Sequence, residues 1–194
     1  MFDIYLASQS PRRAELLTQI GVRFKQCSVD VDESVLQSES PKGYITRVTR
    51  LKLVAACAKL GSDKPVLVAD TSVILGDVIM GKPTSFEQSA KMLKQLSNVW
   101  HEVYTMVAVG YENQIYQTLQ ISRVKFRPIS SEEMQAYWDS GEPQDKAGSY
   151  GIQGLGSVFI ERIEGSYTGI MGLPHFEAAK LLEKCGIKIL GESA

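Results

Sequence analysis

The sequence contains few residues of the two types that most often build metal and redox sites. Its three cysteines, Cys27, Cys57 and Cys185, are far apart and form no C-x-x-C pair. This spacing indicates neither a disulfide framework nor a zinc ribbon, and it fits a reducing compartment. The two histidines, His101 and His175, belong to no H-E-x-x-H motif, and no G-x-S-x-G motif is present. Zinc hydrolysis and Ser-His-Asp catalysis therefore have little support.

Long hydrophobic runs and a surplus of one charge are also missing. No run approaches the roughly 18 apolar residues of a membrane helix, and no basic segment precedes a long apolar stretch at the N-terminus. The 21 basic and 22 acidic residues give a formal net charge of -1. Nonspecific nucleic-acid binding needs a basic surplus. We therefore expect a cytoplasmic protein with no nucleic-acid or membrane partner, in which any positive site is local.

Helical and strand patterns alternate along the chain. The periodicity and the capping residues predict helices over 11–20, 41–60, 84–98, 130–141 and 173–186. Apolar runs and turn residues predict strands over 3–8 and 22–31, a reversal at Gly76-Asp77 within 64–83, and a hairpin over 102–129 that turns near Glu112-Asn113. Isolated strands together with hairpins favour an α/β fold, with a mixed twisted sheet and flanking helices.

Two consecutive arginines, Arg12 and Arg13, stand at the start of the first predicted helix. Ser10 is a plausible N-cap there, with Pro11 at the first helical position. The amide groups and the dipole at a helix N-terminus favour an anion, and two guanidinium groups would add donors suited to phosphate oxygens. The alternative is a basic helix start exposed to solvent.

Acids and cations follow at intervals that suit a metal-bound polyphosphate. Asp70 directly follows the apolar run "PVLVA", so a carboxylate stands at the end of a buried strand, where ligand sites of open α/β sheets occur. Glu33 is an acid in a polar loop, and Lys52 and Lys82 are cations. Mg²⁺ prefers carboxylate oxygens, while cations neutralise phosphates. The alternatives are an aspartate that turns the chain and ordinary surface lysines.

The stretch "GSYGIQGLG" is the most glycine-rich part of a long glycine-dense region, 141–172. Its glycines have neither the order nor the preceding strand of a dinucleotide fingerprint, and no P-loop motif is present. Glycines let a backbone approach a ligand closely, and Gln153 offers both a donor and an acceptor. A flexible connection is the alternative.

These motifs together resemble the Maf family of nucleoside triphosphate pyrophosphatases, in particular the bacterial subgroup that acts on dTTP and UTP. The resemblance is carried by "ASQSPRRAELL", Glu33, "RLKLVAA", "LVADTSVILGDVIMGKP", "DKAGSYGIQGLG" and "GSYTGIMGLP", and it covers nearly the whole chain. It implies one Maf-like domain over 1–194, with two lobes around a central cleft. It also implies a divalent metal, Mg²⁺ or Mn²⁺, and a possible homodimer. The implied reaction is hydrolysis of a nucleoside triphosphate to the monophosphate and pyrophosphate.

The resemblance also assigns roles to single residues. Asp70 matches the proton acceptor, and Glu33 matches a metal ligand together with Asp70. Base selection is implied for Arg12, Thr71 and Gln153. Phosphate binding is implied for Ser8, Arg13, Lys52 and Lys82. The alternative function is a nucleotide-binding regulator of cell division (septum formation) with little turnover.

Overall fold

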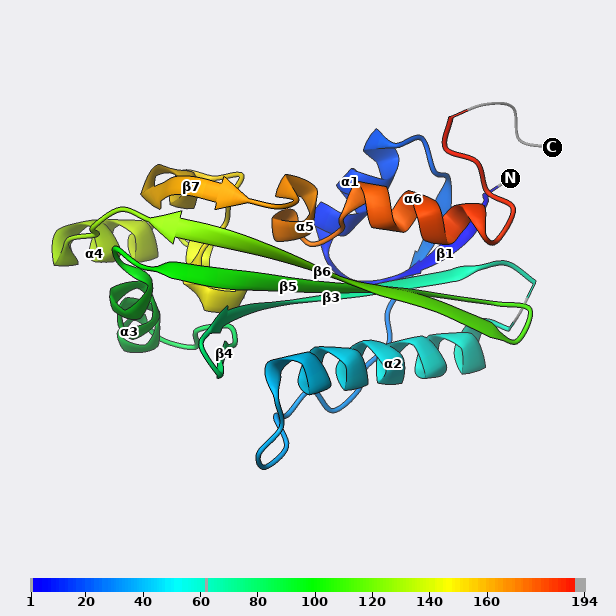
Figure 1. The fold of residues 1–194 in the computed structure, drawn as a ribbon, viewed down its shortest axis with the longest axis horizontal. Helices are drawn as coiled ribbons and strands as arrows, with labels where there is room; N and C mark the ends of the chain where they lie inside the picture. The colour runs from blue at the N-terminus through cyan, green and yellow to red at the C-terminus, as the bar shows by residue number, and fades with distance from the viewer. Residues whose placement is uncertain (1, 62, 191–194) are drawn as a thin grey trace. The chain divides into compact units, whose positions relative to one another are not determined.

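The computed structural model describes residues 2–61 and 63–190, and it confirms the predicted α/β class (Figure 1). Its strands are β1 (Ile4–Ala7), β2 (Phe24–Cys27), β3 (Val66–Leu75), β4 (Val78–Met80), β5 (Trp100–Tyr111), β6 (Gln114–Phe126) and β7 (Ile160–Glu164). In the described part of the chain they form a seven-stranded sheet in the order β2-β1-β3-β5-β6-β7, with β4 paired to β3. The sheet is mixed, because β1 is parallel to β2 and β3, whereas β4 and β7 pair antiparallel with their neighbours.

The helices flank this sheet. They are α1 (Pro11–Gln19), α2 (Pro41–Leu60), α3 (Phe86–Leu96), α4 (Ser131–Asp139), α5 (Tyr167–Met171) and α6 (His175–Glu183). Three short 3₁₀ helices are η1 (Glu142–Asp145), η2 (Ala147–Ser149) and η3 (Leu155–Phe159). Among the described residues, no helix combines the length and the apolar character that crossing a membrane would require.

The chain divides into two compact units. The first unit comprises the residues up to Asp70, Thr105–Gln120 and the residues from Gly172 onward, and the second comprises Thr71–Tyr104 and Ile121–Met171. Three of the four boundaries therefore fall inside β3, β5 and β6, and the fourth follows the end of α5 at Met171. Two units agree with the two predicted lobes, whereas the central cleft and the single domain over 1–194 stay predictions.

In the first unit, α2 lies on one side of the strands, and α1 and α6 lie on the other (Figure 1). The bounds of α2 match the prediction, because the Ser40 hydroxyl caps the helix by accepting from the Gly43 N–H, and Gly61 ends it with a φ of 80°. Strand β2 is shorter than predicted and stands at the end of the strand order. Just beyond it, the Ser28 carbonyl accepts from the Lys59 ammonium instead of from a neighbouring strand.

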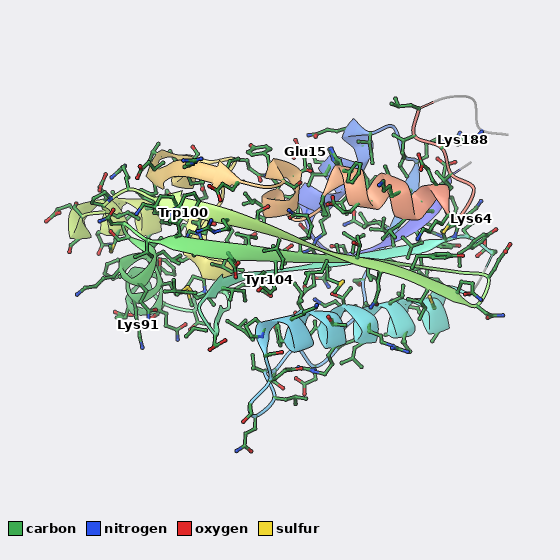
Figure 2. All side chains as sticks on the ribbon, in the orientation of Figure 1. Glu15, Lys64, Lys91, Trp100, Tyr104 and Lys188 are labelled. Carbon is green, nitrogen blue, oxygen red and sulfur yellow. The ribbon has the colours of Figure 1, made fainter. Side chains whose placement is uncertain are left out.

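In the second unit, β3 turns into β4 at Gly76-Asp77 and β6 pairs with β7. Its buried core is built around Phe126, whose ring meets His101 and Tyr150 edge-on at centroid distances of 4.9 and 4.7 Å. Helices α3 and α4 contact each other, and Figure 2 shows Lys91 extending from α3 away from the strands. Strand β7 lies within the glycine-dense region, and the sequence did not predict it.

Candidate active site

Ser8 and Arg13 are joined at the turn from β1 into α1. Ser8 is buried, and its hydroxyl accepts from the Ser10 N–H at 3.1 Å and from the Arg13 guanidinium at 3.3 Å. The Nε of Arg13 also donates to the Gly172 carbonyl at 2.9 Å. Arg13 is therefore held at two points within the first unit, and a fixed guanidinium is a suitable donor to phosphate oxygens.

The start of α1 concentrates positive charge. Burial is the main cause that lowers the pKa of Arg13 from its ordinary value, and the neighbouring Arg12 charge lowers it further, whereas the Asp70 carboxylate opposes both. The first turn of α1 contains no acidic residue, and Ser10 occupies the N-cap position without a side-chain capping bond. Two cations at the positive end of a helix dipole repel one another, so an anion bound there would be favoured.

Lys52 connects the two predicted metal ligands. From α2, its ammonium lies 2.8 Å from Asp70 Oδ1 and 2.9 Å from Glu33 Oε1. The side chains of Lys52 and Asp70 are only 14% and 11% exposed, whereas that of Glu33 is 50% exposed. A buried carboxylate needs a charged partner, and Lys52 supplies it. The structure therefore brings together Glu33, Lys52 and Asp70. The first and the last of these residues are 37 positions apart in the sequence.

The loop that carries Glu33 is fastened to α2 by two residues that the sequence analysis did not single out. The Tyr44 hydroxyl donates to the Glu33 carbonyl at 3.1 Å, and Arg47 donates to the Ser34 carbonyl at 2.8 Å and to both carboxylate oxygens of Glu39 at 2.7 Å. Burial, followed by the Asp70 and Glu33 charges, raises the pKa of Tyr44 to about 12, so its hydroxyl stays protonated. Tyr44 and Arg47 are three residues apart and are therefore neighbours on the surface of the helix. This spacing was the available sequence signal that they act together.

The carboxylates Asp70 and Glu33 fit a divalent cation that also binds phosphate. Among residues 2–61 and 63–190, no three or more histidine, cysteine or acidic side chains gather in a group that could hold a metal by themselves. Mg²⁺ is usually bound by one or two carboxylates together with substrate phosphates and water. Asp70 and Glu33 share one cationic partner, the Lys52 ammonium, and a metal bound to them would need its remaining ligands from phosphate and water.

Three further predicted residues belong to the second unit. Thr71 directly follows Asp70 in β3 and is partly buried. Lys82 is exposed just after β4, and Gln153 is exposed in a turn between η2 and η3. The Gly81 carbonyl, next to Lys82, accepts from the Gly148 N–H at 3.0 Å, which ties this loop to the start of the glycine-rich segment.

The segment before Gln153 is packed against the core of the second unit. Gly148 has a φ of 66°, and a Cβ there would lie 2.8 Å from Val73, so the position requires glycine. The Ser149 and Ser89 hydroxyls are 2.5 Å apart, and the Tyr150 hydroxyl lies 2.8 Å from His101 Nε2. The flexible connection considered for this stretch is therefore wrong for residues 148–150, which are buried.

Two residues that the sequence analysis missed contact the backbone around Gln153. Tyr137 and Glu142 lie at the end of α4 and the start of η1, and together they contact Gly151, Leu155 and Gly156. Their partners are backbone N–H groups, which residue types alone do not reveal. The first of the two acidic residues in "GEPQDK", Glu142, stands close to the glycine-rich stretch, and this position was the available signal.

Comparisons with known proteins identify the family of this chain. A family model described as "Maf-like protein" matches residues 3–185. A dTTP/UTP pyrophosphatase of Methylobacillus flagellatus is 52% identical, with 98% of this chain and 96% of that protein covered. Proteins of the same name are 47% identical in Hahella chejuensis, with 96% and 94% covered, and 43% identical in Neisseria meningitidis serogroup A, with 97% and 96% covered.

Among solved structures, the Staphylococcus aureus Ham1 protein matches 81% of this chain and 79% of its own, at 17% identity and a TM-score of 0.46. The assignment rests on the sequence matches, which extend over nearly the full length. The chain belongs to the Maf family.

Proposed function

We propose that the protein hydrolyses dTTP and UTP to the nucleoside monophosphate and pyrophosphate. The relatives that carry this name, at 43% to 52% identity over nearly the whole chain, support it. The observation in the structure that supports the proposal is the contact of Lys52 with both Asp70 and Glu33, in which a buried carboxylate lies beside a cation that also contacts a second carboxylate.

In this reaction Asp70 is the proton acceptor. Its carboxylate orients the attacking water and accepts a proton from it at an Oδ atom, as general bases do. Ser8, Arg13, Lys52 and Lys82 bind the phosphates, and the cations among them stabilise the charge that develops on pyrophosphate. The fixed position of Arg13, between the Ser8 hydroxyl and the Gly172 carbonyl, supports its part in this role.

Glu33 and Asp70 would hold the divalent metal, Mg²⁺ or Mn²⁺. When bound, such a cation neutralises phosphate charge and makes a coordinated water more acidic. The hydrogen bond from Tyr44 and the bonds from Arg47 keep the Glu33 loop beside α2. This chain therefore contributes oriented carboxylates, and the phosphates of the substrate complete the coordination.

Base selection is proposed for Arg12, Thr71 and Gln153. Uracil and thymine share a carbonyl and an imide N–H on one edge, and the Gln153 amide can pair with both. Cytosine offers a different pattern at one of these positions.

The alternative of a nucleotide-binding regulator of cell division is not better supported. A homodimer and a cytoplasmic location also stay predictions.

A substrate screen tests the proposal. Purified protein with Mg²⁺ is incubated with each common nucleoside triphosphate and with several modified pyrimidine triphosphates, and pyrophosphate and orthophosphate are measured separately. We expect pyrophosphate release to be fastest with dTTP and UTP. Release of orthophosphate alone would contradict the reaction, and tight binding without turnover would favour the regulator.

A further inference from the structure

A single carboxylate in the second unit binds the backbone on the C-terminal side of Gln153. Glu142 Oε2 accepts from the Leu155 N–H at 2.6 Å, and Oε1 accepts from the Gly156 N–H at 3.1 Å. These bonds involve an ionised acceptor and are stronger than bonds between neutral groups. Burial raises the pKa of Glu142, but the bonds from Tyr137, Gly156 and Leu155 outweigh it and leave the pKa below its ordinary value.

The phenol of Tyr137 extends this contact to the N-terminal side. Its hydroxyl donates to Glu142 Oε1 at 2.7 Å and accepts from the buried Gly151 N–H at 3.1 Å. The ring is 4% exposed and packs edge-on against Phe159 at 5.1 Å, so the hydroxyl has a fixed position. Gln153 therefore stands between two backbone segments that are bound to the same pair of side chains.

The glycines beside Gln153 bring the backbone close to this pair. A Cβ at position 154 would overlap the Glu142 carboxylate, and a Cβ at position 156 would lie 2.6 Å from the Tyr137 hydroxyl. Neither Gly154 nor Gly156 has a positive φ, so the reason for glycine here is the close approach and not the backbone conformation. The glycines of this turn therefore leave the space that the side chains of Tyr137 and Glu142 occupy.

From these contacts we propose that Tyr137 and Glu142 are positioning residues for Gln153. They fix the backbone of residues 151–156, and the exposed Gln153 amide is thereby presented to the base in one orientation. The inference rests on the proposed role of Gln153 in selecting uracil and thymine. It adds that base selection depends on two residues that do not themselves touch the nucleotide.

Glu142→Gln is the sharpest variant, because it keeps the shape but turns one acceptor oxygen into an NH₂ donor that faces a backbone N–H. We expect the ratio of kcat/KM for UTP over CTP to fall about fivefold, which corresponds to one lost hydrogen bond of average strength. The loss should appear mainly in KM for UTP. Tyr137→Phe keeps the ring against Phe159, removes only the hydroxyl, and should lower the ratio in the same direction.

Glu133→Gln is the matched control. Glu133 lies at the other end of α4, where it completes the capping box with Ser130 and pairs with Arg127 at 2.6 Å. This control should lower the melting temperature and leave the UTP over CTP ratio unchanged. An equal change of the ratio in the control, or an unchanged ratio in both Glu142→Gln and Tyr137→Phe, would overturn the positioning role.

A double variant separates this inference from the proposal on which it rests. If Glu142 acts through Gln153, then Glu142→Gln should change the ratio in the wild type but not in a Gln153→Ala background. A further change in that background would show that Glu142 acts independently and would overturn the inference. An unchanged ratio in Gln153→Ala alone would instead remove Gln153 from base selection, and the positioning role would fall with it.

Discussion

The two units hold their polar residues by different means. In the first unit, charged side chains contact one another, as Lys52 does with Asp70 and Glu33. In the second unit, side chains hold a stretch of backbone, as Tyr137 and Glu142 do around Gln153. Charged side chains suit the phosphates, which are the same in every nucleoside triphosphate. A fixed backbone suits the base, because the base differs between substrates and is distinguished by hydrogen-bonding groups held in defined positions.

This contrast predicts that changes to the charged contacts around Lys52 affect all triphosphates alike, and that changes around Gln153 affect them unequally. Two predictions concern the charges of the first unit, one concerns the amide of the second, and the last concerns the stability of the second unit. They are ordered from the largest expected effect to the smallest.

Removal of divalent metal should have the largest effect. We expect a chelator to abolish pyrophosphate release, and Mg²⁺ or Mn²⁺ to restore it, because a bound divalent cation would neutralise phosphate charge and make a coordinated water more acidic. The measurement is pyrophosphate release after chelation and after titration with each metal. Undiminished activity in the chelator would show that neither Glu33 nor Asp70 acts as a metal ligand.

Asp70→Asn should lower turnover at least about a hundredfold for every triphosphate, because it removes the proposed proton acceptor and a negative charge while keeping the size. Steady-state kinetics with UTP, dTTP and CTP measure this. Asp77→Asn, in the exposed turn between β3 and β4, is the control and should leave turnover unchanged. Wild-type turnover in Asp70→Asn would rule out Asp70 as the base.

Gln153→Ala should act selectively. If the amide pairs with the base in a desolvated position, its loss costs about 1–3 kcal/mol, or roughly 5- to 150-fold in kcat/KM for UTP and dTTP. The effect on CTP should be smaller. The test is the ratio of kcat/KM for UTP over CTP in the variant and the wild type. An equal loss for all substrates would leave base selection to Arg12 or Thr71.

The smallest effect concerns the stability of the second unit at low pH. Burial lowers the pKa of His101 to about 4 from an ordinary value of 6.5, so the folded state keeps His101 neutral where the unfolded chain takes up a proton. Stability is therefore lost as the pH falls from 6.5 toward 4, at no more than about 1.4 kcal/mol per pH unit.

His101→Gln removes this titration and can still form a hydrogen bond with the Tyr150 hydroxyl. Denaturant unfolding at several pH values should show a shallower loss of stability in the variant, relative to the wild type, across this window. Parallel pH profiles for the two proteins would show that His101 contributes nothing to the pH dependence.

Features set by local sequence were the ones that could be predicted. The bounds of α2 follow from Ser40, Pro41 and Gly61, and the turn at Gly76-Asp77 follows from the two residues themselves. Strand β7 was missed because its pairing with β6 is distant in the chain, and the surrounding glycines resemble a loop. Its segment "IERIE" carries too few apolar residues to stand out.

The residues of the candidate site also differ in whether the sequence alone could predict them. Asp70 could be singled out because it directly follows an apolar run, and carboxylates are almost never fully buried unless they are paired. The contact of Lys52 with Glu33 and Asp70 depends on how α2 packs, which residue spacing alone does not give. Glu142 and Tyr137 could not be predicted, because their partners are backbone N–H groups at least 13 residues further along the chain.

Three of the four boundaries between the units fall within β3, β5 and β6, and this arrangement limits how the protein can be rearranged genetically. Each unit is assembled from separate stretches of the gene, so no contiguous segment contains the whole of one unit without part of the other. Chimeras should tolerate crossovers best at exposed turns, such as the one at Glu112-Asn113, where both flanking strands stay with their own parent. A crossover between Asp70 and Thr71 would instead separate the proposed base from a proposed specificity residue at a single peptide bond.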